Sequence, residues 1–299
     1  MIQVCGLNKT FDGFPALTDL NLHVKKGAIY GLIGTNGSGK TTVINHLTGV
    51  WKQDSGTVII DGQPVFDNEA LKRRIGYIPD DLRFFAGYTL KEASTYFRGL
   101  YPRWNSQRFD QMVEQFHLDR KKKISRFSKG MQKQAAFSLI MSAMPDLLIL
   151  DEPIDGLDPL IRKLVWKHIV EDVADRETTV LVSSHNLREM EGICDSIGIL
   201  DHGHMVLERD LDELKSDIHK VQVAFRGPVP DGAYEGLNIL HKETRGSVDL
   251  LIVRNRRDLV ERQIEAANPA IFDLLPLSLE EIFIYELGGE TIALESILF

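Results

Sequence analysis

Short apolar runs alternate with helical patterns over residues 1–210. Residues 28–34, 146–152 and 178–185 each centre on a short apolar run, and such runs predict buried strands. A glycine-rich turn and a helical pattern at 40–48 follow the first of them. Because strands that alternate with helices are typical of parallel sheets, the pattern predicts an α/β domain.

Residues 80–144 have a helical period instead. Apolar side chains recur at helical spacing in 89–101, 106–118 and 129–144, so we expect a helical insert within the sheet domain. Further along the chain, two apolar strands flank Asp-His-Gly at 201–203, which indicates a hairpin.

The pattern changes again after residue 210. Two strand patterns and one helix pattern lie between residues 220 and 268. Ser278 is followed by Glu281, the spacing of a capping box at the start of a helix. We therefore predict a small α+β extension over residues 211–299.

Charge bears on the partners of the chain. The net charge is −8, and residues 211–299 contribute sixteen acidic against nine basic side chains. Nucleic-acid-binding proteins usually carry a basic patch or stripe. The basic run at 120–123 is short and is interpreted as a solvated helix end or loop, so we expect no nucleic-acid partner.

The apolar runs also bear on membranes. The longest of them fall far short of the ~20 residues that span a bilayer. The N-terminus lacks the basic start and apolar run of a signal peptide. We expect a soluble chain without a transmembrane segment, whose membrane association runs through a partner.

The first chemical motif is the stretch GTNGSGKTT at 34–42. It fits G-x-x-x-x-G-K-[ST] after a strand and before a helix, the context of a phosphate loop, rather than a chance glycine turn. Its glycines let backbone N–H groups face phosphate oxygens, and the helix N-terminus adds partial positive charge. We expect Lys40 near the β- and γ-phosphates, Thr41 on Mg²⁺ and Thr42 near the α-phosphate. The residues predicted to bind nucleotide here are Gly34, Thr35, Asn36, Gly37, Ser38, Gly39, Lys40, Thr41 and Thr42.

A second motif ends the predicted strand at 146–152, where four apolar residues lead to Asp151 and Glu152. Buried carboxylates need a charged partner, and Mg²⁺ is a natural one. We expect Asp151 to hold the metal and Glu152 to act as general base or to position water; the alternative is two carboxylates that face solvent. His185 ends a neighbouring predicted strand at the carboxyl edge of the sheet, where α/β proteins bind ligands, although a lone histidine is more often structural.

Taken in order, the phosphate loop, the helical insert, FSKGMQKQ, LLILDEP, GLD and SSH resemble the motifs of ABC transporter nucleotide-binding subunits. The resemblance covers roughly residues 1–210. It implies a P-loop NTPase domain with a mixed sheet core, an antiparallel β subdomain and a helical subdomain at about 80–144. It also implies that the chain binds ATP and Mg²⁺ and hydrolyses the ATP.

The resemblance gives roles to single residues. Phe11 stands where the family has an aromatic ring that stacks on adenine, and residues 34–42 match the Walker A loop. Asp151 and Glu152 match the Walker B pair. Asp158 ends the D-loop match GLD, and His185 matches the switch histidine that contacts the γ-phosphate. The implied catalytic residues are Lys40, Glu152 and His185.

The stretch FSKGMQKQ at 127–134 stands where the family has its signature, usually LSGGQ. In the family, two subunits close head to tail, and the signature of one caps ATP on the Walker A loop of the other. The resemblance thus implies that Ser128 and Gly130 bind the γ-phosphate held by a second copy or by a related ATPase subunit. Lys129 and Met131 depart from the usual signature, while the serine and the second glycine remain.

Asp80 is the sharper departure. In IGYIPDD it stands where the family has the Q-loop glutamine, which links Mg²⁺ and attacking water to the membrane subunit. A carboxylate can accept from water or approach Mg²⁺, but it cannot donate as an amide does, and it adds negative charge near the triphosphate. The alternative is that the alignment slips and Asp80 merely caps the following segment.

The leading hypothesis is an ATPase subunit that powers an ABC-2-type export complex. Its membrane-spanning permease would be a separate chain that holds this one at the cytoplasmic face of the cell membrane. One alternative is a soluble ABC ATPase acting on ribosomes or DNA, which the single ATPase domain, the acidic charge and the lack of a heptad run disfavour. Another is an ATP-gated scaffold with slow turnover, which Asp80 keeps open. The stretch at 277–287 resembles the C-terminal extension of ABC-2-type ATPases. The apolar stretch 292–299 is expected to pack on its own domain, and the alternative is an interaction surface.

Overall fold

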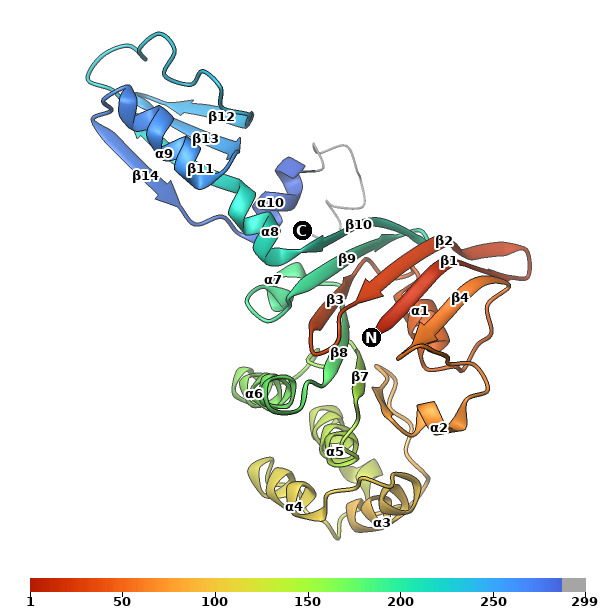
Figure 1. Cartoon of the computed structure of the whole chain (residues 1–299). Coiled ribbons are helices and arrows are strands. Elements are labelled where there is room, and N and C mark those ends of the chain that lie inside the picture. The colour runs from red at the N-terminus through yellow and green to blue at the C-terminus, as the bar shows by residue number, and fades with distance from the viewer. Residues whose placement is uncertain (287–299) are drawn as a thin grey trace. The chain divides into compact units, whose positions relative to one another are not determined.

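The structure is a computed structural model that describes residues 1–286 (Figure 1). The chain forms two compact units. Among the described residues, the first comprises residues 1–185 and 196–208, and the second comprises residues 186–195 and 209–286. The functional boundary after residue 210 stays a prediction, and the apolar stretch 292–299 lies outside the described residues.

The largest sheet of the first unit has six strands in the order β10-β9-β3-β8-β7-β6 (Figure 1). Its central strands pair in parallel, and every side chain of β3, β7 and β8 is buried. The three predicted buried strands and the strands of the predicted hairpin are therefore confirmed. The strands are β3 (Ile29–Ile33), β6 (Ile75–Ile78), β7 (Leu147–Asp151), β8 (Thr179–Ser184), β9 (Ser196–Asp201) and β10 (His204–Asp210).

A second, antiparallel sheet has the order β2-β1-β4-β5. The helix α1 (Lys40–Leu47) buries Val43, Ile44 and Leu47 in one apolar core with side chains of both sheets. This core anchors one side of α1, the helix that follows the glycine-rich turn. The strands are β1 (Ile2–Phe11), β2 (Phe14–Val24), β4 (Ser55–Ile60) and β5 (Gln63–Pro64), and a short helix, α2 (Glu69–Lys72), follows them.

The predicted helical insert is confirmed between β6 and β7 (Figure 1). Each helix begins at a polar cap: Thr89 forms a capping box with Glu92, and Asn105 and Ser128 accept backbone N–H groups of the next two helices. The elements are α3 (Leu90–Leu100), α4 (Ser106–Gln115), the 3₁₀ turn η1 (Ile124–Arg126) and α5 (Lys129–Ser142), and α6 (Pro159–Arg176) follows β7.

The second unit is built on an antiparallel sheet in the order β12-β13-β11-β14. The apolar side of α9 covers one face of it with Val260 and Ile264, which confirms the predicted α+β character. Ser278 and Glu281 form the predicted capping box through bonds of 3.0 and 3.2 Å. The elements are α7 (Leu187–Met190), α8 (Leu211–Asp217), β11 (Ile218–Ala224), β12 (Ile239–Arg245), β13 (Val248–Arg254), α9 (Arg257–Ala266), β14 (Ile271–Leu275) and α10 (Leu279–Glu286).

None of the helices among residues 1–286 combines the length and the apolar composition that crossing a membrane requires.

Candidate nucleotide-binding site

The phosphate loop joins β3 to α1 in a conformation that requires glycine. Gly37 and Gly39 have φ angles of 84° and 112°, which side chains strongly disfavour. A Cβ on Gly34 would lie 2.4 Å from the carbonyl oxygen of Leu200. Among the described residues, no side chain caps α1, so its first N–H groups remain available to an anion.

Lys40 is buried at the start of α1, and its ammonium group is held across the loop. Its Nζ donates to the carbonyl oxygens of Gly34 at 2.7 Å and Thr35 at 3.1 Å, and lies 3.7 Å from Oε1 of Glu152. Burial lowers the pKa of Lys40, while the carboxylates of Glu152 and Asp151 oppose that shift. A poorly solvated ammonium gains most from pairing with a phosphate group.

Asp151 lies buried at the end of β7 with two hydroxyl donors. Thr41 Oγ1 donates to Oδ2 at 3.1 Å, and Ser183 Oγ donates to Oδ1. Hydroxyl and carboxylate oxygens are the ligands that Mg²⁺ takes when substrate phosphates complete its shell. The donor set formed by Thr41 and Asp151 therefore fits that ion. Ser183 was not predicted; its position in the strand pattern just before His185 was the available signal.

Glu152 follows β7 in a strained conformation, with a φ of 46° that is uncommon outside glycine. Its N–H donates to Ser183 Oγ at 3.1 Å, and its Oε2 lies 3.0 Å from Nδ1 of His185. Its Oε1 is buried without a hydrogen-bond partner among residues 1–286. Burial raises the pKa of Glu152, which makes its carboxylate a stronger base.

These groups share one cavity of about 350 Å³. It combines backbone of the phosphate loop, the acidic pair and two aromatic rings, while His185 contacts Glu152 from outside the lining. Phe14 was not predicted, although it follows Phe11 by three residues across the turn between β1 and β2. The lining residues are Phe11, Phe14, Ala16, Asn36, Gly37, Gly39, Lys40, Thr41, Thr42, Asp80, Asp151 and Glu152.

The ring of Phe11 is braced at the edge of this cavity. Trp51 packs edge-on against it with 4.8 Å between ring centroids, and Lys9 places its ammonium 5.3 Å from its centroid. Phe11 is 36% exposed, so part of this residue remains accessible.

Ser128, Gly130 and Asp158 do not line the cavity. Ser128 Oγ accepts the N–H of Met131 at 3.2 Å, and Asp158 caps α6 by accepting the N–H of Leu160 at 2.8 Å. A Cβ on Gly130 would lie 3.6 Å from the side chain of Leu157, so the signature stretch adjoins the GLD stretch. Ser38 is buried in the loop, and its Oγ has no partner among the described residues.

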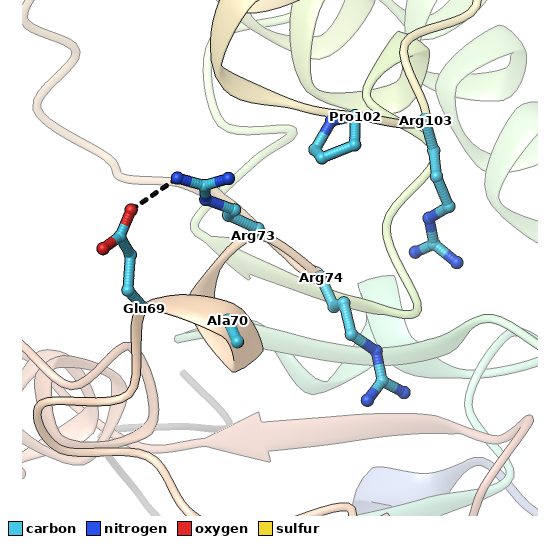
Figure 2. Close-up of a pocket in the computed structure, with 6 residues that line it drawn as sticks. All are labelled: Glu69, Ala70, Arg73, Arg74, Pro102 and Arg103. Carbon is cyan, nitrogen blue, oxygen red and sulfur yellow. Dashed lines mark hydrogen bonds and ion pairs between the residues drawn. The ribbon is translucent and has the colours of Figure 1, made fainter.

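A larger cavity, of about 580 Å³, lies elsewhere in the first unit and is lined by Glu69, Ala70, Arg73, Arg74, Pro102 and Arg103 (Figure 2). Its arginines are paired with carboxylates. Arg73 pairs with Glu69. Asp146 accepts from both Arg74 at 2.6 Å and Arg103 at 2.7 Å, and Asp61 accepts from Arg74 at 2.6 Å. Because these charges balance, we interpret this cavity as a structural junction and not as an anion site.

Comparison with known proteins decides the family. Residues 17–155 match the profile of the ABC transporter family. The chain is 33% identical over 290 residues to the ABC transporter ATP-binding protein YtrB of Bacillus subtilis, an alignment that covers 97% of this chain and 99% of that protein. The chain belongs to the ABC transporter ATP-binding proteins.

A further relative supports this assignment, and a solved structure supports the fold. This ABC protein is 31% identical over 312 residues to the bacitracin transport ATP-binding protein BcrA of Bacillus licheniformis, which covers 98% of this chain and 99% of that protein. Its fold matches the ATP-binding cassette MJ0796, solved as a dimer bound to ADP and Pi, with a TM-score of 0.65 at 22% identity over 71% of this chain and 99% of that one. The predicted fold class is therefore confirmed, and the protein is an ATPase.

The braced ring of Phe11 yields a first prediction for this ABC protein. We expect Phe11→Ala to weaken ATP binding about tenfold, because base–aromatic stacking is worth ~1–3 kcal/mol. Titration with a fluorescent ATP analogue measures the change. Phe66→Ala is the matched control, since Phe66 is also exposed and also lies under a lysine but does not line the cavity. Equal ATP affinity of the Phe11 variant and the parent would show that adenine does not stack on this ring.

Proposed function

We propose that this ABC protein is the ATP-hydrolysing subunit of an ABC-2-type export complex, with Mg²⁺-ATP bound between two ATP-binding subunits placed head to tail. One observation carries the proposal. A single chain brings Lys40, Thr41, Asp151 and Glu152 to one cavity but leaves the signature residue Ser128 outside it. The 31% identity to a bacitracin transport ATP-binding protein supports export.

The chemistry of the cavity suits phosphoryl transfer to water. Lys40 would bind the β- and γ-phosphates, and Thr41 with Asp151 would hold Mg²⁺, which supplies charge neutralisation when bound. Glu152 would accept a proton from the attacking water. The oxygen of that water would bond to the γ-phosphorus while the bond between the γ-phosphorus and the oxygen that stays with ADP breaks. His185 holds Oε2 of Glu152, which orients the base.

The signature stretch would complete the site in the second subunit. Ser128 and Gly130 stand at the exposed N-terminus of α5, a 14-residue helix whose partial positive charge favours a phosphate group. ATP bound in this way joins two subunits, and its hydrolysis removes the shared ligand, so the cycle drives motion by mass action. The second subunit is a further copy or a related ATPase chain.

The membrane subunit would bind near the segment that follows Asp80. There an apolar cavity of about 190 Å³ lies between this segment and the helices α3 and α5, walled by aromatic rings that include Phe85 and Tyr96. Phe85 is 56% exposed and packs against Tyr88 and Tyr96, so aromatic side chains gather at this surface. We propose that a membrane-spanning permease covers it and holds the ATPase at the cytoplasmic face of the membrane.

Co-purification tests this function. We expect the tagged chain, isolated from its native cell in mild detergent, to bring a stoichiometric multi-span membrane protein, identified by mass spectrometry. Phe85→Ala should lower the recovered permease severalfold while leaving ATP binding intact. Val170→Ala, which trims an exposed apolar side chain of α6, is the control. Recovery of ribosomal or DNA-repair proteins without a membrane protein would instead favour a soluble ABC ATPase.

A further inference from the structure

Lys133 of α5 reaches the wall of the ATP cavity from the helical insert. Its Nζ donates to the carbonyl oxygen of Glu152 at 2.8 Å and lies 3.4 Å from Oδ1 of Asp80. The side chain is only 13% exposed, so this ammonium group is largely removed from water. The ammonium group of Lys133 thus connects the helical insert to Glu152, the proposed general base, and to Asp80, which replaces the Q-loop glutamine.

The charge of Asp80 explains why a cation is needed there. A glutamine at this position would be neutral, whereas the carboxylate of Asp80 adds negative charge to a cavity that already holds Asp151 and Glu152. Like charges in a partly desolvated site repel one another and repel a triphosphate strongly. An ammonium group at 3.4 Å offsets this repulsion.

The contact with Glu152 has a separate effect. Glu152 holds a left-handed φ of 46°, a conformation that persists only when surrounding contacts impose it. The bond from Lys133 to its carbonyl oxygen is one such contact, and the bond from its N–H to Ser183 Oγ is another. Together they fix the direction in which the Glu152 side chain leaves the strand.

We propose that Lys133 is a positioning residue of the ATPase reaction, with two separable tasks: it neutralises Asp80 so that the cavity accepts ATP, and it fixes the main chain of Glu152. The proposal rests on the ATP site of the proposed function and not on export. Asp80 and Lys133 then form a compensated pair in which each residue makes the other tolerable.

The test is a double-mutant cycle on binding of the non-hydrolysable analogue AMPPNP with Mg²⁺. We expect Lys133→Gln to raise Kd about tenfold, since the Asp80 carboxylate then repels the nearby phosphates without a compensating ammonium group. The double variant Asp80→Gln with Lys133→Gln should return to within about threefold of the parent. Lys163→Gln, which removes an exposed lysine of α6 that does not line the cavity, should leave Kd unchanged.

Steady-state kinetics separate the two tasks. In Lys133→Gln, KM should rise and kcat should fall; in the double variant KM should recover while kcat stays low, because the contact with the Glu152 carbonyl is still missing. If Lys133→Gln raises Kd by the same factor in the parent and in the Asp80→Gln variant, the proposed charge compensation between Lys133 and Asp80 is wrong. Recovery of kcat together with KM would overturn the second task.

The single variant Asp80→Gln tests the pairing even if the Lys133 variants fail to fold. We expect it to fold normally, because the Asp80 side chain is 58% exposed. Here the freed ammonium should tighten AMPPNP binding about threefold. Unchanged or weaker binding would contradict the pairing. Failure of the parent itself to bind AMPPNP would instead count against the ATP site of the proposed function.

Discussion

Replacing Glu152 by glutamine is expected to slow ATP hydrolysis by about 10²- to 10⁴-fold, the range that a positioned general base contributes. Glutamine has the same shape and can still contact His185, but it cannot accept the proton of the attacking water. ATP binding should survive, because the phosphate loop and Lys40 are untouched. Phosphate release under saturating ATP measures the rate, and size-exclusion chromatography with ATP should show an accumulated dimer.

Glu114→Gln is the matched control for this experiment, since it removes one carboxylate from the exposed side of α4. It should hydrolyse ATP as fast as the parent. A Glu152 variant that matches the parent would show that the base lies elsewhere. A parent that binds ATP but releases no phosphate above the background of the assay would favour the slow ATP-gated scaffold.

Local patterns explain what the sequence predicted well. The strands β3, β7 and β8 are short and buried throughout, and the phosphate loop must use glycine where φ is positive. Each of these signals lies within about ten residues of chain. The helices of the insert were equally predictable from the sequence, because their apolar period and their polar caps are local features.

Contacts between distant segments explain what the sequence could not predict. Ser183 meets Asp151 across two neighbouring strands, and Lys133 meets Asp80 across 53 residues of chain. Neither serine nor lysine is unusual in its own segment. The left-handed conformation of Glu152 is likewise imposed by its neighbours and leaves no mark on residue type.

The roles of Ser128 and Gly130 depend on whether the ATP site is completed by a second chain, and mixing two inactive variants decides this. Lys40→Ala removes the ammonium that faces the phosphates and is expected to cost roughly 2–5 kcal/mol of ATP binding. Gly130→Asp places a carboxylate where the γ-phosphate of the other subunit would lie. Each variant alone should be nearly inactive.

In a head-to-tail dimer, mixing these variants creates one intact site. The Gly130→Asp chain supplies an unaltered phosphate loop, and the Lys40→Ala chain supplies the unaltered signature that faces it. Random pairing in equal amounts should therefore restore about a quarter of the parental ATPase activity. A mixture of Lys40→Ala with the double variant should stay inactive, because neither chain has an intact phosphate loop. If the first mixture gives only the sum of its two components, the signature does not act on a neighbouring chain, and a single subunit must complete its own site.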